Sequence, residues 1–591
     1  MLVMHLKKTI ATVFVFSMVL LLVSPFLLSQ YAAAQEEKRY FFRITLILDP
    51  GNIDAAEIMA KGWRSIGIDV NVVTMEFTTM MARYRFQGGA LGSTYSDGGY
   101  DVALTGGTHG RDPDLTMRYH TDSQMGRKTA NYNCALYSNG EVDRLLEEGL
   151  KYVDPAKRLP IYHRIQEILH DELPMIHTYR DLAPIGTTKG LDVGPVREGG
   201  GPVYDRAWEF KWEGKEGGSI TFCGELNPPT MFGLYDVTTV QTNCLRLVYG
   251  RLYKDGPKFP TDIPELAESY DLSADLMTYT FHLRKGVTWH DGKPFTADDV
   301  IFTWGLYSNP DVAATGYGYW AKYVKSFKKI DDYTVQLDLA SVFPDAIYRF
   351  ANAPYMMPKH ILGNVPASAA ALKPLDFGKK PVGLGPYKVV EWKADEYMKF
   401  EAFKDYWRGK PPIDSIMFRP IPDKPTAIAA LEKGEVNIVE QQIFWGALIQ
   451  NYDRLKANPN VNISIRQGSG TNHIWVNLKH PVLSNIYVRR ALAHAIDKDS
   501  IVKGPYKGFA TACDQDYRKG INDPWYNTNL KDYEYSLAKA KALMEQAGYK
   551  YTYLEPPKTD PMVYMLPAIG GLVAGLIVGV GVDRVAKRKK T

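Results

Sequence analysis

The C-terminal end of the chain constrains its architecture most strongly. Residues 562–582 carry no charged side chain, and as a helix they are long enough to cross ~30 Å of hydrocarbon. Residues 583–591 follow directly and are strongly basic. Because basic segments beside a membrane helix stay on the cytoplasmic side, the whole preceding chain is expected outside the cell. The pattern predicts a single-pass protein of the cell membrane, with a transmembrane helix at 562–582 and a cytoplasmic tail at 583–591.

The N-terminal end has the pattern of an export signal. Lys7 and Lys8 precede an apolar run at 10–28, and the alanines at 32–34 provide small residues for cleavage. We therefore expect residues 1–35 to be a signal peptide. A retained membrane helix is the alternative, because the apolar run is longer than most signal cores.

The body between these ends is long enough for at least two lobes, since 591 residues exceed one compact core. The composition of the whole chain, with 45% hydrophobic and 23% charged residues, is typical of folded proteins. A net charge of +4 over this length does not indicate a nucleic-acid partner. Short apolar runs such as 461–465 alternate with amphipathic stretches such as 159–170 and 484–502, which predicts an α/β fold.

Sequence motifs of catalysis are missing from the chain. It has no Gly-x-x-x-x-Gly-Lys-Ser/Thr, Gly-x-Ser-x-Gly, His-Glu-x-x-His or Cys-x-x-Cys pattern. His163, His170 and His177 recur every seven residues, but seven residues of helix rise about 10.5 Å, too far for two imidazoles to share one ion. We therefore interpret them as surface histidines and expect no enzyme, no cofactor and no metal site.

The run 275–300 is the most specific pattern in the body. A strand with alternating large apolar residues at 279, 281 and 283 turns at Gly286, and Trp289 is expected to pack against this turn. A second turn then leads into a helix that Thr296 can cap. These residues resemble the family 5 extracellular solute-binding proteins, the peptide- and nickel-type receptors of ABC importers. Because a turn and a cap explain them, we expect them to be structural rather than ligand-binding.

Other stretches resemble the same family in the same order, over about residues 216–550. Residues 383–387 are similar to its Gly-Thr-Gly-Pro-Tyr turn, with Leu384 as a departure. Residues 434–439 resemble a strand that follows a helix, and 488–498 resemble the start of the second lobe.

The first block resembles elements that the family carries last. Residues 46–73 look like its late strand–helix–strand, 100–113 like its ligand-side strand and loop, and 137–174 like its closing helices. This order implies a circular permutation. Two incomplete copies fused in one chain are the rival interpretation.

The resemblance implies a two-lobed α/β fold of the periplasmic-binding-protein type (type II, with an extra subdomain). The second lobe would consist of residues 36–190 and 476–555. Residues 191–475 would form the first lobe with its inserted subdomain, and residues 556–561 would link the body to the membrane helix.

The function that the resemblance implies is the capture of a small organic solute, foremost an oligopeptide, by hinge closure. The partners would be this ligand and an ABC permease in the membrane. Two other classes stay open: a surface receptor or structural protein without transport, and a secreted hydrolase that uses carboxylate pairs.

The loop at 108–113 departs from the peptide-type pattern. Those members place an aspartate here, which can pair with the amino terminus of a peptide. This chain has His109 at that position, and a histidine does not supply a negative charge at neutral pH. Arg111 would instead favour an anionic group. The expected ligand-binding residues are His109, Arg111, Asp112, Tyr319, Trp320, Trp445 and Trp475.

The four cysteines are divided between the expected lobes, with Cys223 and Cys244 in the first and Cys134 and Cys513 in the second. Export permits oxidation. One bridge within each lobe and four buried thiols are therefore equally open interpretations.

Overall fold

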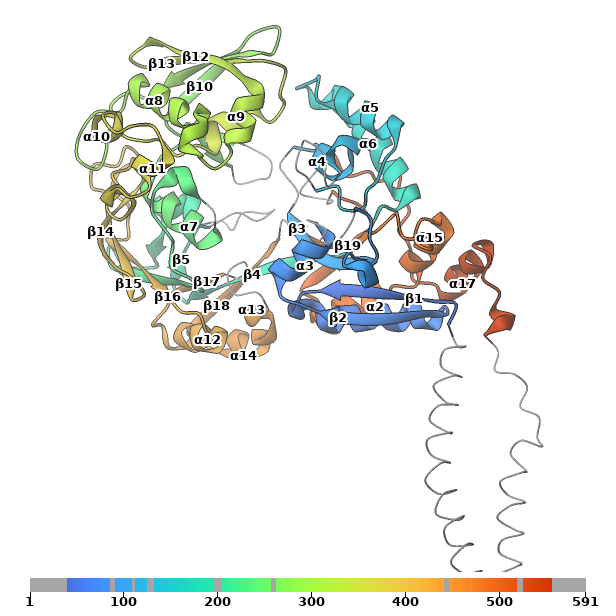
Figure 1. Cartoon of the computed structure of the whole chain (residues 1–591). Coiled ribbons are helices and arrows are strands. Elements are labelled where there is room, and N and C mark those ends of the chain that lie inside the picture. Colours follow the sequence, from blue (N-terminus) through green and yellow to red (C-terminus); the bar gives the residue numbers. More distant parts are fainter. Residues whose placement is uncertain are drawn as a thin grey trace, which may run out of the picture.

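Two lobes make up the body of the protein, each with its own hydrophobic core (Figure 1). The computed structural model describes residues 40–85, 91–108, 112–124, 132–194, 203–236, 238–256, 262–440, 446–468, 470–517 and 524–554. The expected signal peptide, linker, transmembrane helix and cytoplasmic tail lie outside these residues. Among the residues that are described, no helix combines the length and the apolar character needed to cross a membrane.

A large mixed sheet of twelve described strands runs through both lobes. Its order is β14-β15-β16-β7-β17-β4-β19-β3-β1-β2, and β18 and β20 also pair with β4. Its strands are β1 (Phe42–Leu48), β2 (Ile68–Thr74), β3 (Val102–Thr108), β4 (Met175–Thr188), β7 (Ser219–Gly224), β14 (Tyr387–Lys393), β15 (Tyr397–Ala402), β16 (Ser415–Pro420), β17 (Ile438–Glu440), β18 (Val461–Gln467), β19 (Gly470–Val476) and β20 (Ala510–Ala512).

The second lobe is built from both ends of the described chain. Parallel strands β1 and β2 are joined by α2 (Ile53–Ser65), and β1 also pairs with β3. β19 joins β3 to β4, and β4 pairs with β20. The later helices share this core; for example, Trp63 of α2 donates from Nε1 to the carbonyl of Leu492 at 3.0 Å. Residues 40–74 and 476–554 therefore belong to one sheet and one core.

The helices of this lobe surround the sheet. They are α2, α3 (Phe77–Tyr84), α4 (Thr116–Tyr119), α5 (Gly140–Gly149), α6 (Pro155–Glu172), α15 (Ile486–His494), α16 (Lys498–Lys503) and α17 (Leu537–Gln546). The stretch 484–502 was predicted as one helix and forms two. Asp497 accepts a hydrogen bond from the backbone of Ser500 and so caps a new helix there.

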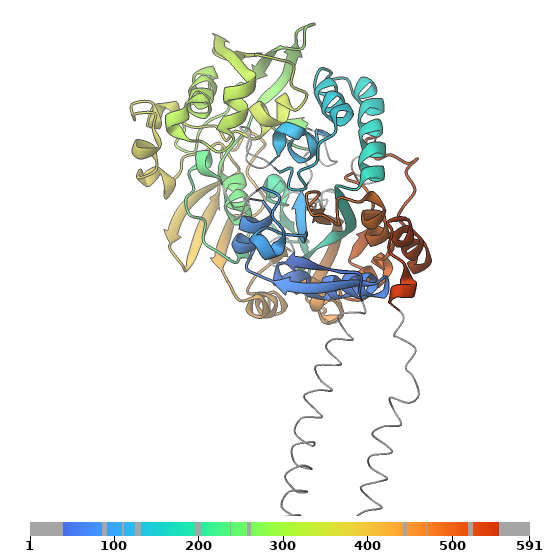
Figure 2. The same ribbon diagram turned by 45° about the vertical axis from the view of Figure 1, so that its right-hand side comes forward.

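The two ends of the described chain meet at one edge of the second lobe (Figures 1 and 2). The Phe41 ring lies 5.2 Å from that of Tyr549 and 5.1 Å from that of Tyr551, measured between centroids. Tyr551 also donates to the carbonyl of Ile66 at 2.9 Å. Aromatic packing therefore holds the first strand to the end of the body.

The first lobe contains the other half of the large sheet and a separate subdomain. The subdomain is a four-stranded antiparallel sheet, β10-β11-β13-β12. Its strands are β10 (Ala267–Leu272), β11 (Thr278–Leu283), β12 (Val324–Asp331) and β13 (Thr334–Leu339); the short pairs are β5 (Leu191–Asp192) with β6 (Lys211–Trp212) and β8 (Tyr253–Asp255) with β9 (Asp262–Pro264). The helices of the first lobe are α7 (Thr239–Val248), α8 (Ala297–Ser308), α9 (Tyr317–Tyr323), α10 (Lys359–Leu362), α11 (Ala369–Leu372), α12 (Lys424–Lys433), α13 (Ala447–Gln450) and α14 (Tyr452–Ala457).

The structural role expected for the run 275–300 is confirmed. The aromatic residues at 279 and 281 lie on β11 and are buried, and Trp289 is fully buried. Thr296 caps α8 in a capping box with Asp299. These residues build the subdomain.

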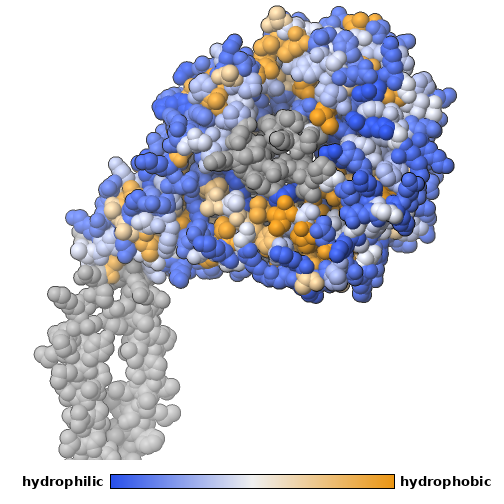
Figure 3. All heavy atoms as spheres, turned by 180° about the vertical axis from the view of Figure 1, so that it is seen from behind, coloured by the Kyte–Doolittle hydropathy of each residue, from blue (hydrophilic) through white to orange (hydrophobic). Residues whose placement is uncertain are grey.

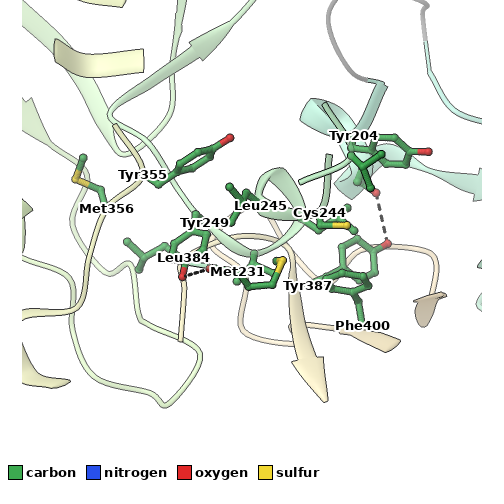
Figure 4. Close-up of a cluster of buried hydrophobic side chains, with 14 of the residues drawn as sticks. Tyr204, Met231, Cys244, Leu245, Tyr249, Tyr355, Met356, Leu384, Tyr387 and Phe400 are labelled. Atoms are coloured by element: carbon green, nitrogen blue, oxygen red, sulfur yellow. Dashed lines mark hydrogen bonds between the residues drawn. The ribbon is translucent and has the colours of Figure 1, made fainter. Parts of the chain in front are cut away.

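The turn at 383–387 packs into the core of the first lobe (Figure 4). Tyr387 is fully buried, and its hydroxyl donates to the carbonyls of Ile413 at 3.2 Å and Ala207 at 3.4 Å. Tyr249 similarly donates to the carbonyl of Met231 at 2.8 Å. The hydroxyl group of each buried tyrosine thus has a backbone carbonyl as its hydrogen-bond acceptor.

His290 connects the two family-like motifs. Its Nδ1 accepts a hydrogen bond from the backbone of Gly383 at 3.2 Å, so Nε2 carries the proton that is donated to the carbonyl of Gly385 at 3.0 Å. Burial lowers the pKa of His290 from 6.5 to about 4. The neutral imidazole is therefore part of the folded structure.

We expect the free energy of unfolding to fall as the pH drops from 6.5 to about 4, because the unfolded chain takes up the proton before folded His290 does. The loss is about 1.4 kcal/mol per pH unit in this window. Urea titrations across the window measure it. His290→Asn can keep both hydrogen bonds without titrating, so its slope should be shallower; an unchanged slope would show that His290 is not the source.

None of the four cysteines forms a disulfide, and Cys134, Cys223 and Cys244 are buried while Cys513 is half-buried. The structure thus agrees with the interpretation as thiols and not with one bridge in each lobe. Burial raises the pKa of the Cys134 and Cys223 thiols to about 12 and that of Cys244 further still.

We expect a thiol-specific reagent to modify at most Cys513 in the folded protein, because only that side chain is partly exposed. All four thiols should react after unfolding without reductant. Mass spectrometry of the labelled protein counts them, and a shortfall in the unfolded sample would reveal a bridge.

The outer surface is mostly hydrophilic when seen from behind, with hydrophobic residues in separate patches (Figure 3). Large hydrophobic side chains that are exposed include Phe77, Leu91, Met117, Leu226 and Ile330. Scattered apolar side chains of this kind are ordinary on a protein surrounded by water.

Candidate ligand-binding site between the lobes

Two neighbouring strands carry the chain from one lobe to the other (Figure 1). Residues 175–179 of β4 pair with β19 in the second lobe, whereas residues 182–188 pair with β18 in the first. β18 and β19 follow each other in sequence, so both crossings lie side by side. In β4, Tyr179 belongs to the second-lobe core and Ile185 to the first-lobe core. In the other crossing, Val461 belongs to the first-lobe core and Ile474 to the second-lobe core. The boundaries between the lobes were expected at 190 and 475 and lie instead within these two intervals.

The crossing is tightly packed. The backbone nitrogen of Gly468 donates to the carbonyl of Asp181 at 3.2 Å, and a Cβ at Gly468 would lie 2.9 Å from that oxygen. Asn472 donates from Nδ2 to both carboxylate oxygens of Asp181 at 3.2 Å. These hydrogen bonds at Asp181, Gly468 and Asn472 join the two crossings to each other.

The second-lobe side of the crossing contains a buried polar cluster around Asp516. Tyr119 donates to this carboxylate at 3.0 Å, Arg118 lies 3.6 Å from it, and Nε2 of His177 lies 3.4 Å from it. The guanidinium of Arg180 on β4 donates to the carbonyl of Asp516 at 2.8 Å. The cluster therefore ties helix α4 to the crossing strand.

His177 was interpreted as a surface histidine, and this is wrong, because its side chain is only 7% exposed. It stands on β4 rather than on the helix with the other two. His163 and His170 contact backbone carbonyls of residues 524 and 531.

The last residues of β3 include two glycines, whose backbone is not covered by side chains of their own. Gly106 and Gly107 stand opposite Asn472 and Thr471 on β19, and Gly106 is exposed. His473 is buried next to them, and its pKa is well below 6.5 because of burial and the nearby Arg118. A neutral imidazole and glycine backbone thus border the end of the strand.

Asp112 pairs with an arginine of helix α6. Its carboxylate accepts two hydrogen bonds of 2.6 Å from Arg158, whose side chain is 3% exposed. Both charges of this bidentate pair are used within the second lobe. Asp112, which was expected to contact a ligand, thus pairs with Arg158 of α6 in the structure.

The first-lobe side of the crossing holds a second buried ion pair. Glu440 at the end of β17 accepts from Arg466 of β18 at 2.9 Å, and both side chains are 1% exposed. Asn243 of α7 donates to Glu440 at 3.3 Å. Burial raises the pKa of Glu440, an effect that Arg466 opposes.

The other residues expected at the site lie in different environments. Trp320 is 2% exposed and packs against Trp304 and Phe350 in the first-lobe core, and Trp475 is 4% exposed beside Tyr119. Tyr319 is half-buried and faces Met117 of the other lobe. His109, Arg111 and Trp445 lie outside the described residues. The structure thus places Tyr319 between the lobes and the two described tryptophans within the cores.

The Asp516 cluster and the Glu440–Arg466 pair were not found from the sequence. Tyr119 and Asp516 are 397 positions apart, and no local motif links them. A weak signal existed for Glu440 alone, which ends a short strand whose other two residues are apolar. Such charges are buried only when they are paired.

Comparisons with known proteins identify the family of the chain. The family described as bacterial extracellular solute-binding proteins, family 5 Middle, matches residues 263–563, just over half of the chain. Heme-binding protein A of Haemophilus influenzae is 32% identical over 320 residues, which cover 51% of this chain and 56% of that protein. Oligopeptide-binding protein AppA of Bacillus subtilis is 32% identical over 347 residues, which cover 57% of this chain and 61% of that protein.

The dipeptide-binding protein of Escherichia coli is 31% identical over 362 residues, which cover 56% of this chain and 63% of that protein. The solved structure of AppA from Bacillus subtilis in complex with a nonapeptide is 27% identical, with a TM-score of 0.44, over 58% of this chain and 66% of that one. The chain thus spans about three fifths of the length of these curated relatives. It belongs to the bacterial extracellular solute-binding proteins of family 5.

Proposed function

We propose that the chain is the ligand-binding receptor of an ABC importer and that it captures a small organic solute, with oligopeptides as the leading class. The family membership carries the proposal, and members of this family are binding receptors, not enzymes. The names of relatives include heme-, oligopeptide-, dipeptide- and glutathione-binding proteins. The permease partner is inferred from the family.

Lobe closure provides the mechanism. Each lobe is a rigid core, and β4 and the β18–β19 crossing join the two side by side. A ligand that contacts both lobes binds only the closed arrangement well, so binding shifts the population toward closure. The buried pair Glu440–Arg466 and the Asp516 cluster keep the two sides of the crossing rigid.

The ligand class depends on the loop after β3. His109 would not hold a peptide amino terminus as an aspartate does, and Arg111 would favour an anionic group. Asp112 is engaged by Arg158 and would shape the loop. The proposal therefore includes peptides with an acidic group near the loop.

A circular permutation is our proposal for the order of the chain. Residues 40–190 supply β1, β2, β3 and β4 to the sheet that also contains β19 and β20. The two ends of the described body meet at Phe41 and Tyr549, and permuted proteins commonly have their ends close together. The segments on either side of the first-lobe core, up to Tyr179 and from Ile474 onward, would together form the family's second lobe.

A thermal-shift screen of the purified body, residues 36–558, against peptides, sugars and metal ions tests the receptor function. A ligand at a hundred times its Kd should stabilise the protein by about 2.7 kcal/mol. Peptides should raise the melting temperature and remain intact when recovered. A peptide that is recovered cleaved would support a hydrolase, and a screen without any shift would contradict the proposed receptor.

Membrane anchoring by residues 562–582 is also proposed, because that run is uncharged and a basic tail follows. We expect truncation after Lys558 to release the body into the medium, whereas the full chain should stay with the membrane fraction. Immunoblots of both fractions measure this. Retention of the truncated protein would indicate an uncleaved N-terminal helix instead.

A further inference from the structure

Away from the crossing strands, α9 of the first lobe faces α4 of the second (Figure 1), and a side-chain contact joins the two. The hydroxyl of Tyr319 lies 3.9 Å from Sδ of Met117. Met117 is 42% exposed, so this contact is at the surface between the lobes. A contact so far from the hinge can control how widely the lobes open.

Tyr319 is held firmly on the first-lobe side. Its ring stacks on Phe343 with centroids 6.0 Å apart, and the guanidinium carbon of Arg349 lies 4.1 Å from the ring centroid. Arg349 in turn donates from Nε to Asp345 at 2.8 Å. The ring is therefore oriented before any contact with the other lobe.

Met117 is held equally firmly on the second-lobe side. The next two residues, Arg118 and Tyr119, contact Asp516, which also lies 3.4 Å from His177 of β4. A movement of Met117 is thus transmitted to the crossing strand through one buried carboxylate.

We propose that Tyr319 and Met117 form a latch that holds the lobes together in the absence of ligand. The inference deepens the proposed function, because opening of this latch would admit the ligand. The thioether sulfur is a weak acceptor for the Tyr319 hydroxyl, so loss of this hydrogen bond changes the ratio of closed to open molecules by about two- to tenfold. It biases the equilibrium without locking it.

The distance between the lobes in ligand-free protein tests the latch. Lys151 and Lys293 are both exposed, one in each lobe. Spin labels on Lys151→Cys and Lys293→Cys, in a Cys513→Ser background, report this distance by pulsed electron paramagnetic resonance. Tyr319→Phe and Met117→Leu should each increase the long-distance population about two- to tenfold. The double variant should resemble the more open single variant, because both changes remove one contact.

The control variant is Tyr487→Phe, which removes an exposed tyrosine hydroxyl on α15 and should leave the distances unchanged. Both latch substitutions keep the side-chain volume, and circular dichroism checks that they fold. Unchanged distances in the latch variants, or changes that simply add, would overturn the latch. Since no ligand is used, this outcome is separate from the result of the thermal-shift screen.

Discussion

Replacement of Asp112 by alanine is expected to lower the free energy of unfolding by about 3–5 kcal/mol, because it leaves the buried guanidinium of Arg158 without its carboxylate. Both side chains lie in the interior, at 13% and 3% exposure, so water cannot replace the lost partner. Urea titration of the purified body measures the change. The result decides between a structural and a ligand-binding role for this residue.

A surface ion pair provides the control. Asp499→Ala breaks the exposed pair with Lys503, a pair of 2.8 Å on α16, and should leave the unfolding midpoint unchanged. If Asp112→Ala unfolds like the unsubstituted protein but loses a ligand found in the screen, the structural role is wrong and the role expected from the sequence is right.

Leucine in place of Gly62 is expected to prevent the second lobe from assembling. A Cβ at this position of α2 would lie 1.9 Å from the carbonyl oxygen of Ala495, at the end of α15. A backbone atom cannot move aside as a flexible side chain can, so the helices must separate. Alanine should already cost about 1–3 kcal/mol of stability, as overpacking does. Soluble yield and the cooperativity of urea unfolding measure both variants.

Gly305 of α8 is a matched glycine, because it also lies within a helix but a Cβ at its position would meet nothing within 4 Å. Gly305→Ala should be neutral or stabilising by about 0.5–1 kcal/mol, since glycine weakens helices. Normal folding of Gly62→Leu would mean that the segments 40–74 and 486–494 do not pack together, and would remove the structural support for the permuted order.

The sequence was most informative where chemistry is local. Thr296 was expected to cap a helix, and it does so with a capping box, because a cap needs only residues three positions apart. The strand–helix–strand that the family resemblance implied at 46–73 is found as β1, α2 and β2, over residues 42–74.

The sequence was less informative about the candidate site. Trp320 and Trp475 were expected to contact ligand and are packed in the cores, because an aromatic residue has the same appearance in a sequence at either place. Asp112 was expected to contact ligand, and its partner Arg158, which lies 46 positions away, was not predicted from the sequence. No pattern in the sequence indicated a role for Met117 of the latch.

The sequence by itself determined the class of the protein, the local elements and the expected position of the membrane anchor, because these depend on composition, periodicity and short motifs. The tertiary structure decided which charges are paired, where the lobes cross and which residues face each other between them. Those contacts join positions up to hundreds of residues apart, such as Tyr119 with Asp516 and Trp63 with Leu492. Only the folded chain brings them within hydrogen-bonding distance.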